Sequence, residues 1–338
     1  LDANTYSLTH YNEADRVVKE WKDLETQAEK INQLLPAEYR DAFFQLVLHP
    51  VKAFANLHEL YVSVARNRLN AAKNLPEANA YAQQAKQFYI NDSLLTQQYH
   101  HIAGGKWNHM MDQTHIGYTY WQQPPVNKMP EVKYVSMETA VDSGFVFNTS
   151  AASAKNTIAK NTGNNRFTEQ DGVVSMEAEY WTRAVNTQKI KWKVIPDIGR
   201  TGSGITTFPV TTSTPLTASG PHVEYDFFTN DSGKLNINLY FSPTLNFHND
   251  EGLKFAVSVD NEEPKTITLN KEDNNVQTWG SWVANNIIIK NSEHTINKPG
   301  KHVLKYWMIS PAVVLQKLVI DLGGLKPSYL GPPETKMQ

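Results

Sequence analysis

Two glutamates that could do chemistry stand two positions apart in the stretch VVSMEAEYW, residues 173–181. The alternation of apolar and polar residues predicts a β-strand, in which side chains at positions i and i+2 point to the same face. Glu177 and Glu179 would therefore place two negative charges side by side. Their repulsion has to be offset by bulk water, a basic side chain, a metal ion, or a proton shared during catalysis.

Three hypotheses for this glutamate pair stay open. The pair can lie exposed on a half-solvated sheet face, or it can hold a structural cation. Calcium suits such a site because it accepts carboxylate and carbonyl oxygens, and Asp321, near the chain end, could complete it. The third hypothesis is the acid and nucleophile of a glycosidase, whose carboxyl groups lie on opposite sides of a substrate at ~5–10 Å. Two carboxylates on one strand face are poorly arranged for that chemistry.

A second group of residues suited to recognition lies between positions 106 and 130, where Trp, Tyr, His and Met are dense and no period is visible. Flat aromatic faces with polar groups around their rim are suited to stacking against sugar rings. The candidate sugar contacts are Trp107, His109, Asp112, His115, Tyr118, Tyr120 and Trp121. The alternative is that these aromatic side chains seal the joint between two domains.

Composition limits the remaining chemistry. The net charge of −2 indicates no nucleic-acid partner, which would favour a strongly basic face. No apolar run approaches the roughly 18 residues of a membrane span, and the absence of cysteine excludes disulfides and thiolate metal sites. The adjacent His100 and His101 would diverge on a helix and would chelate one ion poorly. The chain opens with Leu1 and shows no signal-peptide pattern, so we expect a processed protein or a piece of a longer one.

The elements that must position these residues change in kind along the chain. Apolar residues recur every three or four positions in the first hundred residues, which predicts three or four antiparallel helices with short loops. The first helix is expected to bury Ala14, Val17, Trp21, Leu24, Ala28, Ile31 and Leu35. Pro50 should kink or restart the second helix because proline lacks an amide donor and clashes one turn back.

From residue 131 onward, short segments alternate apolar with polar residues and are separated by Gly, Asn, Asp or Pro, beginning with VKYVSMET at 132–139. This pattern predicts an antiparallel β-sandwich of about eight to ten strands. We therefore expect a multidomain α and β chain: a helical bundle over 1–105, an aromatic-rich connector over 106–130, and a β-sandwich of galactose-binding-like or jelly-roll type over 131–338.

Three stretches together resemble a known family: GGKWNHMMDQTHIGYTYWQQPP, VSMEAEYWTRA and WMISPAVVLQKLVIDLGGLKPSYLGPPE. They are similar to the C-terminal half of family 115 of the glycoside hydrolases, the xylan α-1,2-glucuronidases of bacteria that degrade plant cell walls. The resemblance covers essentially the whole chain. It implies an enzyme with an N-terminal α/β domain, a catalytic TIM barrel, a helical domain and a C-terminal β-sandwich, of which this chain looks like the last two.

The resemblance also implies what this portion does. The acid and base carboxylates of the family lie in the barrel, so no catalytic residue is carried over and the chain alone is expected to be inactive. The implied roles are structural support, homodimerisation through the helical domain, and lining of a partner active site. The implied polysaccharide is glucuronoxylan, and the implied location is the periplasm or the cell exterior.

The stretch EAE, at residues 177–179, is also similar to the opening of family 6-like and family 35-like carbohydrate-binding modules. In those modules a Glu-x-Glu pair ligates a structural calcium, which is implied here for Glu177 and Glu179. The alternatives to an accessory part of an enzyme are a free-standing carbohydrate-binding protein and a structural dimerisation module. The broad apolar face of the bundle, with Trp21, Phe43, Phe44, Phe54 and Tyr61, favours the dimerisation module.

Overall fold

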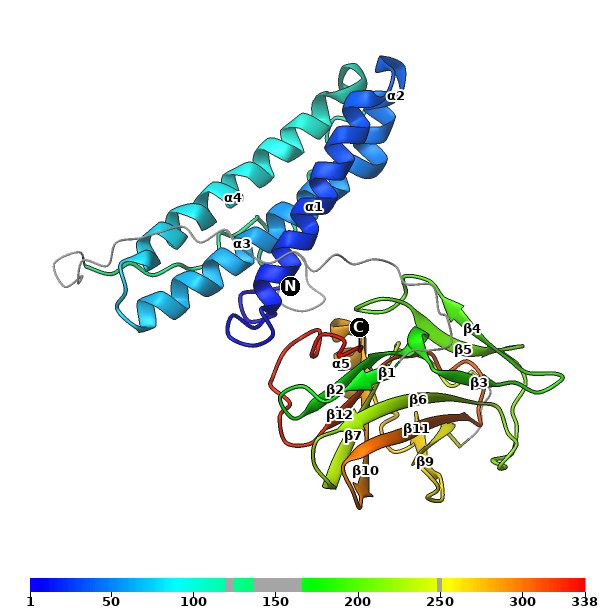
Figure 1. Ribbon diagram of the computed structural model, residues 1–338. Coiled ribbons are helices and arrows are strands. Elements are labelled where there is room, and N and C mark those ends of the chain that lie inside the picture. The colour runs from blue at the N-terminus through cyan, green and yellow to red at the C-terminus, as the bar shows by residue number, and fades with distance from the viewer. Residues whose placement is uncertain (119–123, 137–165, 248–250, 338) are drawn as a thin grey trace. The chain divides into compact units, whose positions relative to one another are not determined.

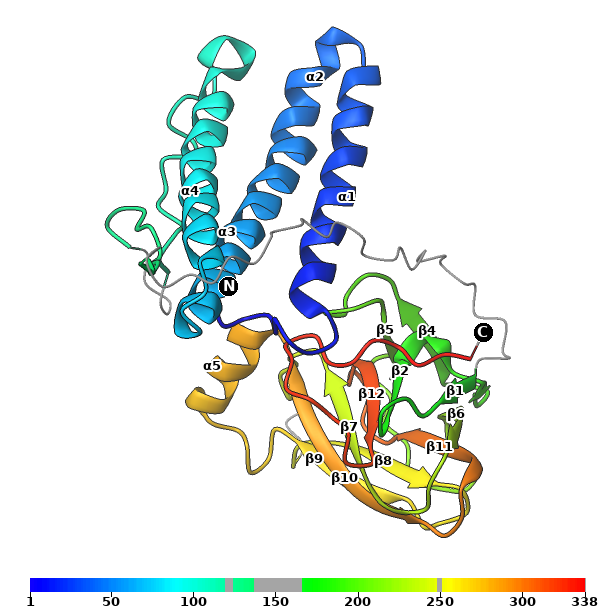
Figure 2. The same cartoon turned by 60° about the vertical axis from the view of Figure 1, so that its left-hand side comes forward.

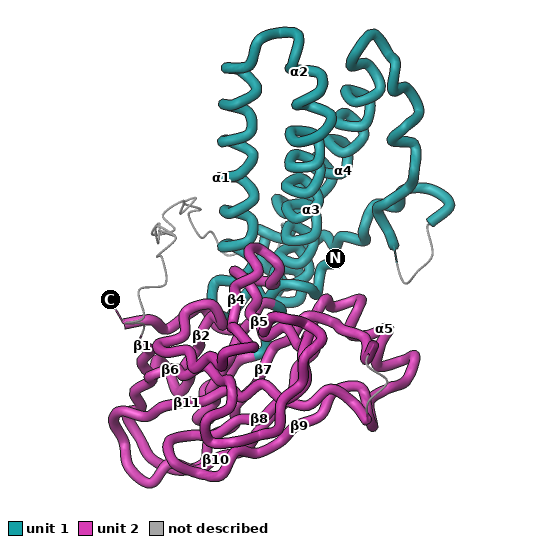
Figure 3. The backbone as a smooth tube through the Cα atoms, turned by 90° about the vertical axis from the view of Figure 1, so that its right-hand side faces the viewer, with its two compact units in different colours: residues 1–151, 327–329 teal, residues 152–326, 330–338 magenta. Residues whose placement is uncertain are grey.

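The computed structural model describes residues 1–118, 124–136, 166–247 and 251–337. The chain divides into two compact units, which Figure 3 colours separately. Unit 1 contains residues 1–151 and 327–329, and unit 2 contains residues 152–326 and 330–338. The first unit is helical and the second is built from strands, as the sequence predicted (Figure 1).

Unit 1 is an antiparallel arrangement of three long helices, in which α3 packs against both α1 and α4 (Figure 2). The helices of this unit are α1 (Glu13–Leu34), the short α2 (Ala37–Phe43), α3 (His49–Ala72) and α4 (Glu77–His101). A π-helical turn, Phe44–Leu48, joins α2 to α3, and Pro50 stands in the first turn of α3. The backbone stays helical from α2 through this turn into α3, so the chain neither breaks nor restarts at Pro50, and the π-helical turn before the proline accommodates its missing amide.

The buried face of α1 is narrower than the sequence pattern predicted. Ala14, Val17 and Ala28 are buried, whereas Leu24 and Ile31 are 44% and 48% exposed. Periodicity identified the helix correctly, but α1 meets its neighbours along only part of the apolar stripe. The rest of that stripe remains on the surface of unit 1.

After α4 the chain runs back along the helices instead of entering a sheet. The strand expected at 132–139 is absent from the described part of that stretch, residues 132–136. Two buried or half-buried asparagines explain the extended course of this segment. Asn67 donates to the carbonyls of Ala78 and Lys133 and accepts from Lys133 N, and Asn79 exchanges two bonds of 3.0 Å with the backbone of Val135. The backbone thus finds helix side chains in place of a neighbouring strand.

Unit 2 is a β-sandwich of two six-stranded sheets among the described residues. The first sheet has the order β1-β6-β11-β8-β9 with β3 also on β6, and the second has the order β10-β7-β12-β5-β4 with β2 on β12. The first sheet comprises β1 (Arg166–Thr168), β3 (Arg183–Val185), β6 (His222–Thr229), β8 (Leu253–Val259), β9 (Lys265–Leu269) and β11 (Gly300–Met308). The second comprises β2 (Val173–Glu177), β4 (Lys191–Ile195), β5 (Gly204–Phe208), β7 (Gly233–Phe241), β10 (Ile288–Ile296) and β12 (Leu315–Asp321), and the helix α5 (Val276–Asn285) precedes β10.

The core of the sandwich consists of the inward-facing residues of both sheets. Tyr225, Tyr306 and Phe227 are fully buried there, and Phe241 lies with its ring centroid 4.7 Å from that of Phe255. Strands that alternate apolar with polar residues bury one face in this way. Strands β1 and β3 have three residues each, too short to register as alternating segments, so the chain has more strands than the eight to ten expected.

No helix in the described part of the chain is both long and apolar enough to cross a membrane.

Candidate functional site

The glutamate pair lies at the end of a strand, where the backbone changes conformation. Strand β2 ends at Glu177, and Ala178–Tyr180 forms a 3-10 turn, so the expectation that both glutamates share one strand face was wrong. The two carboxylates nevertheless converge on one loop. A Cβ atom on Gly202 would lie 2.8 Å from Glu179 Oε1 and 3.7 Å from Glu177 Oε2, so only glycine leaves room for them.

A basic side chain offsets the charge of Glu177. Lys317 of β12 is the cross-strand partner of Glu177, and its Nζ donates to Glu177 Oε1 over 2.8 Å. Thr201 Oγ1 donates to the same oxygen, also over 2.8 Å. The two charged side chains are 4% and 11% exposed, so this is a buried ion pair. The second oxygen, Glu177 Oε2, is buried without a hydrogen-bond partner among the described residues.

A third carboxylate adjoins this ion pair from the C-terminal segment. That segment runs beside β2, where Thr335 N donates to Ser175 O and Ser175 N donates to Thr335 Oγ1. It carries Glu334, whose Oε1 accepts from Glu177 N over 3.3 Å. Burial, reinforced by the negative charge of Glu177, raises the pKa of Glu334 to about 7. Lys317 and Glu334 were not among the residues predicted from the sequence, although a lysine within the apolar run VVLQKLVIDL was a usable signal.

Asp321 does not join the two glutamates. It pairs with Val173, four residues along β12 from the Lys317–Glu177 pair, roughly 13 Å at the usual strand rise. Its Oδ1 accepts from Gly323 N and Leu325 N over 2.8 and 3.1 Å, and so closes the turn after β12. Across the residues that the structure describes, no group of three or more histidine or acidic side chains could hold a metal ion.

The connector residues lie on unit 1, where several are tied to helices. The Trp107 ring packs beside the buried cluster around Phe44 and Tyr99, with Lys106 Nζ 4.8 Å from its centroid. His109 is 76% exposed in its side chain and bonds Asp112 over 2.6 Å. Tyr118 is 48% exposed. Tyr120 and Trp121 lie outside the described residues.

His115 is anchored to α4 through a buried acid. Its Nε2 lies 2.7 Å from Asp92 Oδ1, and the Asp92 side chain is 6% exposed. The hydrogen bond to Asp92 raises the pKa of His115. Asn127 Oδ1 accepts from the amides of His115 and Ile116, which fixes the connector backbone at the same place. His115 therefore holds the connector in position.

The sandwich also contains a Ser-His-Glu arrangement that the sequence did not reveal. His294 Nε2 lies 2.7 Å from Ser292 Oγ, and His294 Nδ1 bonds Glu262 Oε1. The order of contacts matches that of a hydrolytic triad. The His294 side chain is 0% exposed and Ser292 is buried, so a substrate carbonyl has no access to the hydroxyl in this structure. We interpret the arrangement as a buried hydrogen-bond network.

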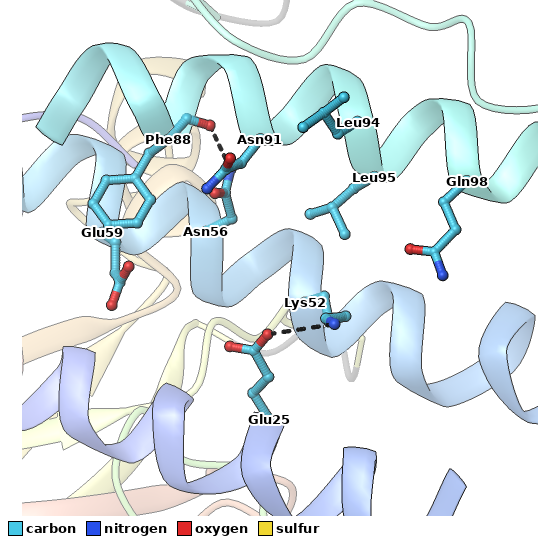
Figure 4. A pocket seen from close by; sticks show the side chains of 9 residues that line it. All are labelled: Glu25, Lys52, Asn56, Glu59, Phe88, Asn91, Leu94, Leu95 and Gln98. Atoms are coloured by element: carbon cyan, nitrogen blue, oxygen red, sulfur yellow. Dashed lines mark hydrogen bonds and ion pairs between the residues drawn. The ribbon is translucent and has the colours of Figure 1, made fainter. Parts of the chain in front are cut away.

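A groove of about 360 Å³ runs along the helices of unit 1 (Figure 4). Lys52 of α3 lines the groove, and its Nζ lies 2.6 Å from Glu29 and 3.9 Å from Glu25 of α1. Asn56 Nδ2 donates to Phe88 O of α4 over 2.8 Å. Burial is the main cause of the raised pKa of Glu25. The remaining lining residues are Glu59, Asn91, Leu94, Leu95 and Gln98.

Comparisons with known proteins agree with the architecture. The sequence profile of the glycosyl hydrolase family 115 C-terminal domain matches residues 166–334, and no curated protein matches the chain. A solved family GH115 4-O-methyl-α-glucuronidase with specificity for decorated arabinogalactans aligns with a TM-score of 0.60 and 18% identity. The alignment covers 91% of this chain and 33% of that one, so the chain spans about a third of that glucuronidase.

Two further solved structures align over less than half of the chain. An exo-β-1,3-galactanase from Phanerochaete chrysosporium aligns with a TM-score of 0.31 and 15% identity, over 44% of this chain and 29% of that one. A family 35 carbohydrate-binding module from Clostridium thermocellum aligns with a TM-score of 0.29 and 11% identity, over 44% of this chain and 97% of that one. The profile match spans half of the sequence, including the whole sandwich from β1 to β12. The chain therefore belongs to glycosyl hydrolase family 115 and contains the C-terminal domain of that family.

Proposed function

We propose that this chain is the C-terminal accessory portion of an α-glucuronidase that removes (4-O-methyl)glucuronic acid side chains from glucuronoxylan. Its roles are to support the catalytic part of the enzyme, to dimerise, and to contact carbohydrate. The observation that carries the proposal is the match of the family's C-terminal domain to residues 166–334.

The arrangement of the carboxylates supports a non-catalytic role for this portion. A glycosidase needs two carboxyl groups that face a substrate from opposite sides. Glu177 instead forms a buried ion pair with Lys317, and Glu179 Oε1 accepts from Ser203 N over 2.9 Å. The described residues form helices and a sandwich, whereas a TIM barrel needs strands and helices in alternation.

The choice of polysaccharide is tested directly. The structurally similar glucuronidase has specificity for decorated arabinogalactans, so an assay should offer the chain both glucuronoxylan and a decorated arabinogalactan. We expect the chain alone to release no 4-O-methylglucuronic acid from either polymer. Release from either one would contradict the accessory role.

Carbohydrate contact is assigned to the connector. The exposed His109 and Tyr118 and the half-buried Trp107 offer a polar group and aromatic faces of the kind that sugars stack on. Asp112 and His115 hold neighbouring backbone and side chains in place. Calorimetry with xylan oligosaccharides should show binding that His109→Ala and Tyr118→Ala weaken. Unchanged binding in both variants would remove the connector from the site.

Dimerisation is assigned to the helical unit. Leu24, Ile31 and Leu34 expose apolar surface along α1, with Leu34 at 76% exposure. Exposed apolar patches mark interfaces. Light scattering should show a dimer that Ile31→Glu weakens, whereas a monomer at high concentration would contradict this assignment.

The second candidate function is a free-standing carbohydrate-binding or dimerisation module, which the same connector and the same α1 surface favour. The sequence upstream of Leu1 in the gene separates the two: a catalytic barrel there supports the enzyme portion. We place the enzyme in the periplasm or outside the cell, where plant cell-wall polysaccharides are met.

A further inference from the structure

The acidic end of strand β2 already contains a cation supplied by the chain itself. Lys317 Nζ lies 2.8 Å from Glu177 Oε1, and the lysine side chain is 4% exposed. The stem of Lys317 is confined by the C-terminal segment, because a Cβ on Gly331 would lie 3.9 Å from its Cδ. The ammonium group therefore has a fixed place between β2, β12 and the loop that contains Thr201.

A divalent metal ion does not fit beside this ammonium group. Calcium would bind a carboxylate oxygen at ~2.3–2.6 Å and would need six to eight oxygen ligands. An ion bound to Glu177 Oε1 would lie close to Lys317 Nζ, and an ion at the unpartnered Oε2 would share the same carboxylate with that ammonium, so in either place two positive charges would repel in a buried site. Asp321, which could have supplied a further carboxylate, closes a turn at the other end of the strand pair.

We propose that the Lys317 ammonium is the resident counter-ion of the Glu177 carboxylate and takes the structural role that a metal ion would have at this position, so that the sandwich folds independently of divalent cations. The charged groups around the pair are Glu334 and Lys336 of the C-terminal segment and Glu179 of the 3-10 turn. Lys317 joins the last strand of the sandwich to an early one, 140 positions away in the sequence.

The energetics of buried ion pairs make this role measurable. Removing one partner leaves a buried charge uncompensated, which destabilises a protein strongly, whereas replacing both partners by neutral groups is often nearly neutral. Thr201 can still donate to Glu177 when Lys317 is absent, but a hydroxyl carries no net charge. Each single substitution at this pair should therefore lower the stability of the sandwich more than the double substitution does.

The first arm of the test uses the unaltered chain. Its melting temperature should be the same, within about 1 °C, in EDTA and in millimolar Ca²⁺, because a ligand that binds only the folded state would raise it. Elemental analysis after dialysis should find no stoichiometric metal. A calcium-dependent rise in melting temperature, or one bound ion per chain, would overturn the proposal.

The second arm is a double-mutant cycle. Lys317→Met and Glu177→Gln should each lower the melting temperature of the sandwich by about 10 °C. The double variant should recover at least half of the loss caused by Lys317→Met. Lys234→Met, at an exposed lysine on the neighbouring strand β7, is the matched control and should change little. Additive losses in the double variant would overturn the pairing.

The third arm tests whether the position of the Lys317 ammonium can be taken by a metal ion. Lys317→Asp replaces the ammonium by a fourth carboxylate near Glu177, Glu179 and Glu334, which creates the oxygen-rich environment that calcium prefers. The variant should be less stable than the parent in EDTA and should regain stability in millimolar Ca²⁺. If it responds to Ca²⁺ no more than the parent does, the position is not equivalent to a cation site, and that part of the proposal is wrong.

Discussion

Burial decides what each ionisable residue near Glu177 does. Glu177 forms a buried ion pair with Lys317. Glu334 adjoins the same carboxylate but has no cation at hydrogen-bond distance among the described residues, and its pKa is raised to about 7. On unit 1, the hydrogen bond to Asp92 raises the pKa of His115, which for a base favours the charged form. Burial is the main cause of the shift at Glu334, with the like charge of Glu177 second, whereas the hydrogen bond to Asp92 is the main cause at His115.

Replacement of Glu334 tests the first of these effects. The pKa of Glu334 rises from an ordinary 4.5 to about 7 on folding, so the folded state holds its proton more tightly than the unfolded state. Stability therefore decreases as the pH rises from 4.5 to 7, and the full cost, on the order of 3 kcal/mol, is present above 7. Glu334→Gln should be more stable than the parent at pH 8 and nearly equal to it at pH 4.5, as measured by urea unfolding.

The control for that measurement is Glu263→Gln, at an exposed glutamate of the same unit, which should give the same stability as the parent at both pH values. A Glu334→Gln variant that gained as much stability at pH 4.5 as at pH 8 would show that ionisation is not the cause.

The second residue-scale prediction concerns His115. Its pKa should lie above the ordinary 6.5 and should decrease when Asp92→Asn removes the carboxylate. The stability that this pair adds is present below pH 6.5 and is lost as the pH rises through the raised pKa. An NMR titration of the imidazole protons measures both values. Equal pKa values in parent and variant would contradict the proposed bond.

At the scale of elements, hydrogen-bonding side chains override local preference. Residues 132–136 alternate in the manner of a strand, yet they lie along α3 and α4 because Asn67 and Asn79 satisfy their backbone groups. A buried carboxamide that both donates and accepts can substitute for a neighbouring strand. The segment that leads out of the connector is thereby fixed to the helical unit.

Asn67→Ala tests this arrangement. Asn67 is fully buried and makes three hydrogen bonds, so its loss removes the bonds to the carbonyls of Ala78 and Lys133 and the bond from the amide of Lys133. The expected cost is about 3 kcal/mol, measured by urea unfolding of the helical unit. Asn70→Ala removes only one bond, to Arg66 O, and should cost less than about 1 kcal/mol. Equal costs in the two variants would show that the segment is held by other contacts.

At the scale of the whole molecule, the chain has separate hydrophobic cores. One core lies between the two sheets of unit 2, and smaller clusters around Phe44 and around Leu60 lie in unit 1. Cores that share no residues can unfold as separate cooperative units, so a single two-state description need not hold for the whole chain.

Calorimetry tests this division. We expect two transitions, of which Asn67→Ala lowers one and Lys317→Met lowers the other, because each substitution affects one core. The unaltered chain under the same buffer conditions is the reference. If both variants shifted a single transition by similar amounts, the two cores would unfold together and the expectation would be wrong.

The sequence by itself determined that a helical part precedes a part built from strands, and it indicated the membership of family 115. Helical period and strand alternation are local properties, and the irregular helical turn before Pro50 follows from the chemistry of one residue. The pattern of α1 showed which residues are apolar, although it could not show that Leu24 and Ile31 remain on the surface. That depends on where the neighbouring helices stand.

Only the tertiary structure decided the meaning of Glu177. Among the four means of offsetting its charge, the sequence could not choose a basic side chain, because Lys317 is 140 positions away and meets Glu177 only through the register of β2 on β12. The sequence could also not show that a 3-10 turn removes Glu179 from the strand, or that Gly202 leaves room for both carboxylates. Contacts of this kind depend on strand register and on close backbone approach, which no local pattern records.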